Sequence, residues 1–213
     1  MRYFVLDQVV GSEAETDFEP VGEVTRGEAP RCPACGRFVG MLPWLPPYRV
    51  KLRTYGSRLG DVAFDVGNNL VLSESFVTAW RSEGLKGLDH LDPVDVVSIR
   101  PKSRARKSER YFHFAVPRTN TTVDWSKSVF LGKAPTCECC GGGREIEAIL
   151  SLRLDDTSWT GEDIFIPRGT SRTIVTERVV DLAKNHDLAN VTTIPLEEFR
   201  WDPLWKLRGM DPS

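Results

Sequence analysis

Residues 136–143 read TCECCGGG, and the CxxCG motif within this stretch has a counterpart far upstream, CPACG. Two cysteines in CxxC spacing lie on one tight turn and can bind the same metal ion. The glycine that follows allows the positive φ with which such a turn closes. The two motifs together predict a tetrahedral structural zinc site, one per chain, with Zn–S bonds of about 2.3 Å. Its four ligands would be Cys32, Cys35, Cys137 and Cys140.

Two other interpretations of the cysteines stay open at this point. They could be unconnected thiols, or one CxxC pair could be a redox site. Cys139 has no counterpart in CPACG, where Ala34 stands, so it is either a spare buried thiol or a reactive one. The histidines lie in unrelated contexts, and we do not expect them to bind the metal; they are His90, His113 and His186.

The composition is that of an ordinary globular protein. The chain has 213 residues, of which 40% are hydrophobic and 27% are charged, with a formal net charge of −2. This length allows one large domain or two small ones, and the charge gives no overall reason to expect nucleic-acid or membrane binding. The sequence has no apolar run of about 18 residues, and its N-terminal segment lacks the features of a signal peptide. We therefore expect a cytoplasmic protein, and in a reducing cytosol clustered cysteines are more often metal ligands than disulfides.

The paired cysteine motifs belong to a longer internal similarity. RYFVL near the N-terminus resembles the later RYFHF, GDVAF resembles GEDIF, and VLSESFVTAW resembles IVTERVVDLA. The matches occur in the same order and at nearly constant separation, which indicates an ancient duplication. The alternative is a chance alignment of common strand and helix patterns. The predicted organisation is a first repeat at 1–100, a basic linker at 101–109 and a second repeat at 110–213, joined by the zinc site in one compact unit.

Each predicted repeat contains the same elements. Apolar and basic residues alternate in YRVKLR (48–53), as in a half-buried strand, and IEAILSLRL (146–154) occupies the equivalent place. RYFVL and RYFHFAV are rich in aromatic and β-branched residues and also favour strands. Ser73 and Thr176 are suited to be helix N-caps, and Gly84 is suited to end the first helix. The expected fold class is α+β, with a mostly antiparallel sheet and one main helix per half.

Two charged runs are candidate contact surfaces. Residues 100–110 hold six basic side chains and one acidic one, which fits either a solvated linker or nucleic-acid binding. Residues 11–23 hold five acidic side chains and no basic one. This acidic loop is either solvated or a contact surface for a basic protein. Its candidate partner-binding residues are Glu13, Glu15, Asp17 and Glu19.

The motifs, taken in this order, resemble the myxobacterial double-CxxCG paralogous family. The resemblance is carried by the two CxxCG motifs, the GEDIF segment, the VTERVVDLA helix start and ANVTTIPLEEF. The family's GxDIF…VSERF-like stretch is matched by Gly161, Asp163, Ile164, Phe165, Val175, Thr176, Glu177 and Arg178. Thr176 stands where serine is commoner, which keeps a hydroxyl, and Val179 replaces an aromatic residue. The resemblance implies an immunity protein that neutralises a toxin delivered by sibling or competing cells, with nuclease toxins as a common class.

The residues themselves favour a binding protein over an enzyme. The sequence contains no GxSxG, no HExxH and no phosphate-binding loop. Glu177 and Asp181 share a helix face, which fits a solvated surface better than a catalytic pair. The expected function is to bind a cognate antibacterial toxin and occlude its active site, with no enzymatic activity and no membrane or small-molecule partner. A zinc-containing nucleic-acid-binding module is the main alternative, and a redox protein that uses Cys139 is a third.

Overall fold

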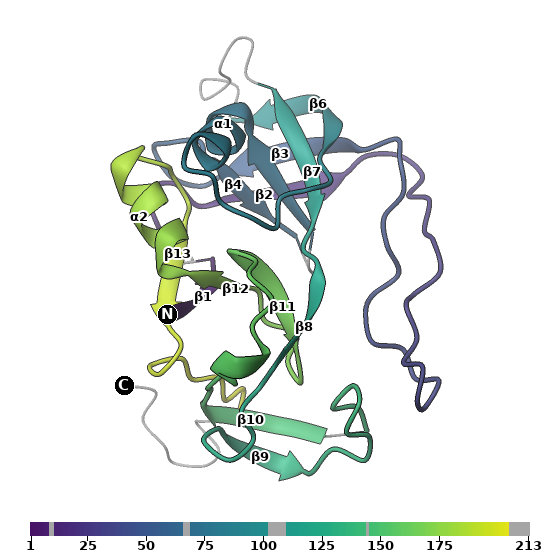
Figure 1. The fold of residues 1–213 in the computed structure, drawn as a ribbon. Coiled ribbons are helices and arrows are strands. Elements are labelled where there is room, and N and C mark those ends of the chain that lie inside the picture. Colours follow the sequence, from purple (N-terminus) through teal and green to yellow (C-terminus); the bar gives the residue numbers. More distant parts are fainter. Residues whose placement is uncertain (9–10, 66–68, 102–109, 144, 205–213) are drawn as a thin grey trace.

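The computed structural model describes residues 1–8, 11–65, 69–101, 110–143 and 145–204 (Figure 1). Most of the predicted basic linker, residues 102–109, lies outside the described residues. The described chain is mostly β-sheet with two α-helices. The expected mixture of helix and sheet is therefore confirmed.

Six strands close into a barrel in the order β2-β3-β6-β7-β5-β4. They are β2 (Thr16–Pro20), β3 (Arg49–Thr54), β4 (Val62–Phe64), β5 (Asn69–Ser73), β6 (Asp92–Arg100) and β7 (Tyr111–Ala115). A five-stranded sheet has the order β13-β1-β12-β11-β8. Its strands are β1 (Tyr3–Asp7), β8 (Arg118–Thr122), β11 (Ile164–Arg168), β12 (Ile174–Thr176) and β13 (Thr192–Pro195). The remaining elements are the paired strands β9 (Val129–Lys133) and β10 (Glu145–Ser151), the helices α1 (Glu74–Ser82) and α2 (Glu177–Asn185), and the 3-10 turn η2 (Asp156–Ser158).

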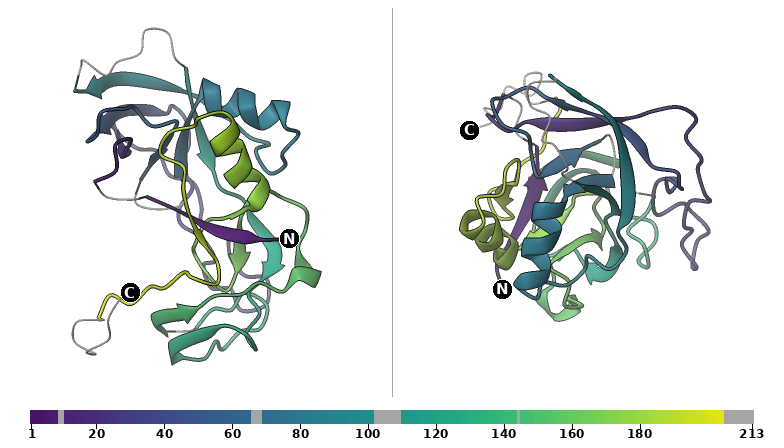
Figure 2. Two further views of the ribbon diagram at one scale, coloured as in Figure 1. Left: turned by 90° about the vertical axis from the view of Figure 1, so that its left-hand side faces the viewer. Right: turned by 90° about the horizontal axis from the view of Figure 1, so that it is seen from above.

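The helices α1 and α2 each follow directly on a strand and lie side by side on one flank of the molecule (Figures 1 and 2). The Ser73 hydroxyl accepts a hydrogen bond from a first-turn amide of α1 at 3.1 Å, as predicted for an N-cap. Thr176 occupies the same position before α2, but its hydroxyl donates to Asp163 at 2.6 Å instead of capping the helix. Gly84 follows α1 with a φ of +62°, which agrees with its predicted role in ending the helix.

The sheets exchange strands between the two predicted repeats. The N-terminal strand β1 pairs antiparallel with β12 and β13, so that Tyr3 lies opposite Thr176. β7 pairs in the same way with β5 and β6, so that Tyr111 lies opposite Ser73. The boundary between the sheets therefore differs from the boundary predicted between the two repeats. Neither repeat forms its sheet alone.

The apolar core is also shared between the two repeats. Trp80 of α1 and Leu182 of α2 are each 1% exposed, and both belong to one buried cluster that also contains Val175 of β12. A second cluster packs beneath β10, and a third fills the barrel. In the barrel, Val50 and Leu52 of β3 are fully buried, whereas the basic residues that alternate with them are not; these are Arg49, Lys51 and Arg53. The alternation predicted for this strand is confirmed.

Each repeat contains one buried aspartate that accepts a hydrogen bond from the loop following the helix of the other repeat. Asp61 accepts hydrogen bonds from the N-cap hydroxyl before α1 and from the amide of Ala189, both at 2.7 Å. Asp163 accepts hydrogen bonds from the hydroxyl before α2 at 2.6 Å and from the amide of Lys86 at 2.8 Å. Ala189 follows α2 and Lys86 follows α1. Charged acceptors make stronger hydrogen bonds than neutral ones, so these contacts fix how the two helices sit together.

Candidate metal centre

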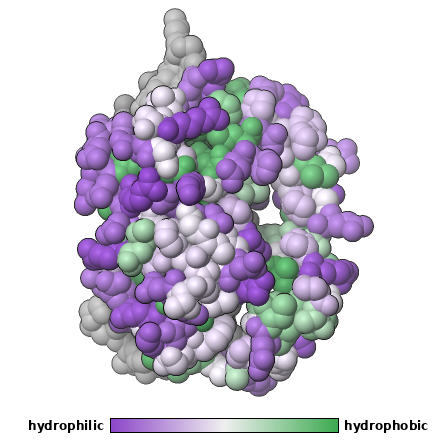
Figure 3. All heavy atoms as spheres, in the orientation of Figure 1, coloured by the Kyte–Doolittle hydropathy of each residue, from purple (hydrophilic) through white to green (hydrophobic). Residues whose placement is uncertain are grey.

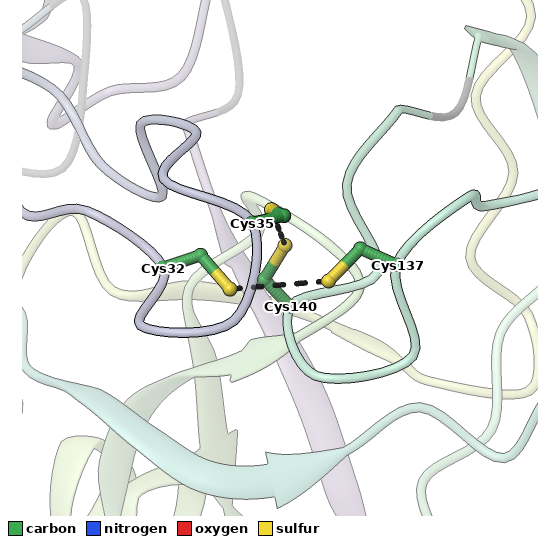
Figure 4. A group of neighbouring side chains, drawn as sticks. All are labelled: Cys32, Cys35, Cys137 and Cys140. Atoms are coloured by element: carbon green, nitrogen blue, oxygen red, sulfur yellow. Dashed lines mark hydrogen bonds between the residues drawn. The ribbon is translucent and has the colours of Figure 1, made fainter.

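The four predicted ligand residues come from two loops that are distant in the sequence. Cys32 and Cys35 lie in the long connection between β2 and β3, and Cys137 and Cys140 lie between β9 and β10. Figure 4 shows their thiols pointing toward one another from these two loops. The structure therefore brings together the four cysteines that the sequence predicts as one site.

The spacing of the sulfur atoms fits a metal ion bound by four thiolates. All four sulfurs lie within 4.8 Å of one another. The Sγ atoms of Cys32 and Cys137 are 3.9 Å apart, and those of Cys35 and Cys140 are 3.8 Å apart. A tetrahedron with Zn–S bonds of about 2.3 Å has S–S edges of about 3.8 Å. The cluster thus has the donor set and the dimensions of a metal site.

The two turns have the same backbone geometry. The Gly36 amide donates to the Cys32 carbonyl at 2.9 Å, and the Gly141 amide donates to the Cys137 carbonyl at the same distance. Both glycines adopt a positive φ, +71° at Gly36 and +66° at Gly141. This is the left-handed conformation that favours glycine, so the predicted role of the residue after each CxxC pair is confirmed.

The electrostatics of the cluster favour a bound cation. A backbone amide at Cys35 donates to the Cys32 sulfur and lowers the pKa of that thiol to about 6. Burial raises the pKa of the Cys140 thiol to about 12. Neighbouring thiolates repel one another, whereas a divalent cation stabilises all of them together and displaces their protons.

The cluster holds the tip of a long segment whose base is anchored in the barrel core, where Trp44 is buried and packs on Phe18 and His113. Residues 21–48 stand away from β8 on the right of Figure 1. Isolated bridges join Arg26 to Trp44 and Arg31 to Phe38 within this segment. Besides the thiols, the guanidinium of Arg37 donates to the Thr136 hydroxyl at 3.0 Å and links the two turns directly. A metal ion here would close a very large loop of the chain and restrain the segment.

Cys139 lies beside the cluster but is not one of the four clustered thiols. It is partly buried. Contact with Cys32 and burial raise the pKa of its thiol. A raised pKa leaves little thiolate at neutral pH, which favours the interpretation of Cys139 as a spare thiol over a reactive one.

The structure does not present the four acidic residues predicted to bind a partner as one free patch. Glu15 is buried, at 8% exposure, and accepts a hydrogen bond from a backbone amide of its own loop at 2.5 Å. Asp17 accepts a hydrogen bond from the Tyr55 hydroxyl at 2.8 Å. Glu19 is exposed and lies 3.6 Å from a guanidinium nitrogen of Arg53; Glu13 is also exposed. A role in partner binding stays a prediction, and of the four residues only Glu13 and Glu19 are exposed.

A cleft that the sequence does not predict adjoins the metal centre. It has a volume of about 750 Å³ and lies between the Cys32–Met41 stretch and the residues around β8 and the end of β11. Figure 3 shows the molecule hollowed on its right-hand side, where residues 21–48 stand away from the sheet. Three arginines line the cleft: Arg118, Arg168 and Arg172. They are scattered in the sequence and form no basic run, so no local signal identifies them.

Both α-helices of the described chain are too short to traverse a bilayer. The chain was also compared with known protein families and with curated proteins. No family and no curated protein matches it.

Proposed function

We propose that this chain is a cytoplasmic immunity protein that binds a cognate antibacterial toxin and occludes its active site. The observation that carries the proposal is a group of exposed apolar side chains on the segment that the cysteine cluster restrains. Phe38 is 60% exposed, Met41 is 59% exposed and Leu42 is 51% exposed. Large apolar side chains gathered on a protein surface are typical of protein–protein interfaces. The resemblance of the motifs to a family of immunity proteins points in the same direction.

The metal centre has a structural role in this proposal. We propose that Cys32, Cys35, Cys137 and Cys140 bind one zinc ion, because four thiolates in CxxC pairs are a preferred donor set of structural zinc. Zinc would restrain residues 21–48 before the partner arrives, so less conformational entropy is lost on binding. The action is binding alone, and no catalytic residue is required.

We also propose that the two halves arose by duplication. The contacts of the two aspartates support this, because Asp61 and Asp163 each accept from their own N-cap hydroxyl and from the loop after the other helix. The strand pairing supports it as well. β4 pairs with β5 and β2 in the barrel, and β11 pairs with β12 and β8 in the other sheet, with the same parallel and antiparallel senses. The helices are of equal length, nine residues each.

Co-expression with the toxin encoded by a neighbouring gene tests the proposed function. The wild-type chain should restore growth and co-purify with the toxin. Met41→Asp and Leu42→Asp should weaken both effects, while zinc content and thermal stability stay at the wild-type values. Val97→Asp is a matched control, because Val97 is also exposed, at 44%, but lies on β6 of the barrel.

The outcomes separate the proposal from its alternatives. Growth rescue that survives Met41→Asp and Leu42→Asp would exclude this surface as the interface. A wild-type chain that neither rescues growth nor co-purifies with any neighbouring toxin would overturn the proposed function. Zinc is tested separately by metal analysis of protein purified without chelators, where one zinc ion per chain is expected.

A further inference from the structure

The cleft beside the metal centre combines a basic wall with an apolar one. Its apolar side includes Phe38 and Met41, which are among the most exposed large hydrophobic residues of the described chain. The basic side carries Arg118 on β8, Arg168 at the end of β11 and Arg172 in the following loop. The same cleft therefore offers both apolar contact and positive charge to a ligand.

The three guanidinium groups that line the cleft form no ion pair with a carboxylate of the described chain. In the part of the chain that the structure describes, none of them has a carboxylate within 4.0 Å. Arg168 is held by a hydrogen bond to the side-chain oxygen of Asn120. Arg172 packs over the rings of Phe199 and Trp201, with distances of 5.2 and 5.5 Å to the ring centres. Aromatic packing and a neutral acceptor orient these groups and leave their charge available to an anion.

Burial among neighbouring atoms lowers the pKa of Arg118 and of Arg172. The carboxylate of Asp7 opposes this effect at Arg172 without forming an ion pair. Both groups stay charged at neutral pH, because the ordinary pKa of arginine is above about 12. Arg172 is also partly buried, whereas Arg118 is exposed to solvent. An anionic ligand would gain more from a partly desolvated cation such as Arg172 than from a fully hydrated one.

The edge of the five-stranded sheet gives the cleft the shape for an extended ligand. β8 is the last strand of this sheet and pairs on one side with β11. Arg118, Thr119 and Asn120 of β8 all line the cleft. At Thr122 the outer edge of β8 already bonds to Ser158 and Asp155. Another extended segment could therefore pair only with the earlier part of this strand.

We propose that this cleft binds an extended acidic segment of the protein partner. The inference rests on the proposed function, since it specifies the chemistry of the partner's contact. Three arginines suit a short row of carboxylates, and the apolar wall suits side chains that alternate with them. A nucleic acid fits less well, because its continuous row of phosphates carries more charge than three arginines can neutralise and the whole chain has a net charge of −2.

Peptide binding measured by fluorescence polarisation tests the inference without the toxin. The probe is a labelled twelve-residue peptide in which glutamate alternates with leucine, and its control has glutamine in place of every glutamate. We expect the acidic peptide to bind the wild-type chain, with an affinity that falls as salt is added. The double variant Arg118→Glu, Arg172→Glu should weaken binding about tenfold or more, because it reverses charges at the contact.

Two further variants control for the reversal of charge and for misfolding. Arg81→Glu is the charge-matched control, since Arg81 is exposed on α1 and does not line the cleft. It should leave peptide affinity unchanged. Arg118→Gln, Arg172→Gln removes the charges without reversing them, and it should weaken binding even if the glutamate variant fails to fold.

Equal binding of the glutamine peptide, or undiminished binding by the glutamine double variant, would overturn the inference. A labelled single-stranded oligonucleotide that binds more tightly than the peptide, and is released by the same substitutions, would overturn it in favour of nucleic acid. Failure of this inference can be told apart from failure of the proposed function. If the arginine variants still protect cells from the toxin, the cleft is not the contact, whereas a wild-type chain that protects against no toxin contradicts the function itself.

Discussion

Asp163 is the residue whose replacement tests most directly how the two helices are held together. Its side chain is 1% exposed, and both carboxylate oxygens accept hydrogen bonds from buried or partly buried donors. The substitution Asp163→Asn keeps the shape of the side chain and removes its charge. The amide oxygen can accept at only one of the two positions, so the donors on the other side lose their acceptor or must reorient.

The expected loss of stability follows from the contacts. Hydrogen bonds to charged acceptors contribute about 1 kcal/mol more than those to neutral ones. Two hydrogen bonds to Asp163 lose this contribution, those from the hydroxyl of Thr176 and the amide of Lys86, so the free energy of unfolding should fall by about 2 kcal/mol. The third donor is the Arg178 guanidinium at 2.9 Å; its side chain is 42% exposed, so its ion pair adds at most about 0.5 kcal/mol. For a chain of this length, a loss of about 2 kcal/mol corresponds to a melting temperature lower by about 4–8 °C.

Urea unfolding followed by circular dichroism, with a constant excess of zinc, measures this loss. Asp61→Asn should have a similar effect, because Asp61 also accepts from two donors at 2.7 Å. Asp181→Asn is the matched control, since Asp181 is exposed on α2, and its free energy of unfolding should change by less than about 0.5 kcal/mol. If Asp163→Asn and Asp181→Asn have the same stability, the argument from the buried carboxylate is wrong.

The remaining predictions concern the metal centre and a buried histidine. Cys140→Ser should lose the bound zinc and lower the melting temperature by about 10 °C or more, because a cross-link that closes a loop of about 100 residues contributes about 4–5 kcal/mol. Cys139→Ser should keep both the zinc and the melting temperature of the wild type. Equal zinc loss in the two variants would contradict the ligand assignment. Gly36→Ala should weaken zinc affinity modestly, through backbone strain of about 1 kcal/mol. Gly141→Ala should weaken zinc affinity more, because its Cβ would also lie 3.1 Å from a backbone carbon. Competition with a zinc indicator measures both affinities, and a larger effect at Gly36 would refute this ranking. Burial lowers the pKa of His113 from 6.5 to about 4, so the unfolded chain binds the extra proton first, and wild-type stability should fall by about 3 kcal/mol as the pH drops from 6.5 to 4. His113→Phe should remove that part of the pH dependence in urea unfolding, and an unchanged slope would show that His113 does not cause it.

The sequence alone was sufficient for features that depend on a few neighbouring residues. A CxxCG turn is closed by hydrogen bonds within five residues, so its geometry at Cys32 and Cys137 could be predicted from spacing and glycine. The helix start at Ser73 and the stop at Gly84 are local for the same reason. The similarity between the two motifs also predicted which four of the five cysteines would meet.

Other features depend on how distant segments pair, and there local reasoning fell short. Thr176 was expected to cap α2, but the buried carboxylate of Asp163 is a stronger partner for its hydroxyl than a backbone amide. The acidic residues of the 11–23 stretch looked like one surface in the sequence. Strand pairing and neighbouring side chains instead bury Glu15 and engage Asp17 and Glu19.

The sequence by itself determined the cysteine turns, the start and end of α1 and the alternation of β3, because each depends mainly on residues that are close in the chain. Only the tertiary structure decided that β1 pairs with β12 and that β7 pairs with β5. Strands with the same alternation can pair in many ways, and the choice is made by the whole buried core. The arginine cleft has the same origin, because Arg118, Arg168 and Arg172 share a cleft only after β8 has joined β11 and the cysteine cluster has brought residues 21–48 alongside.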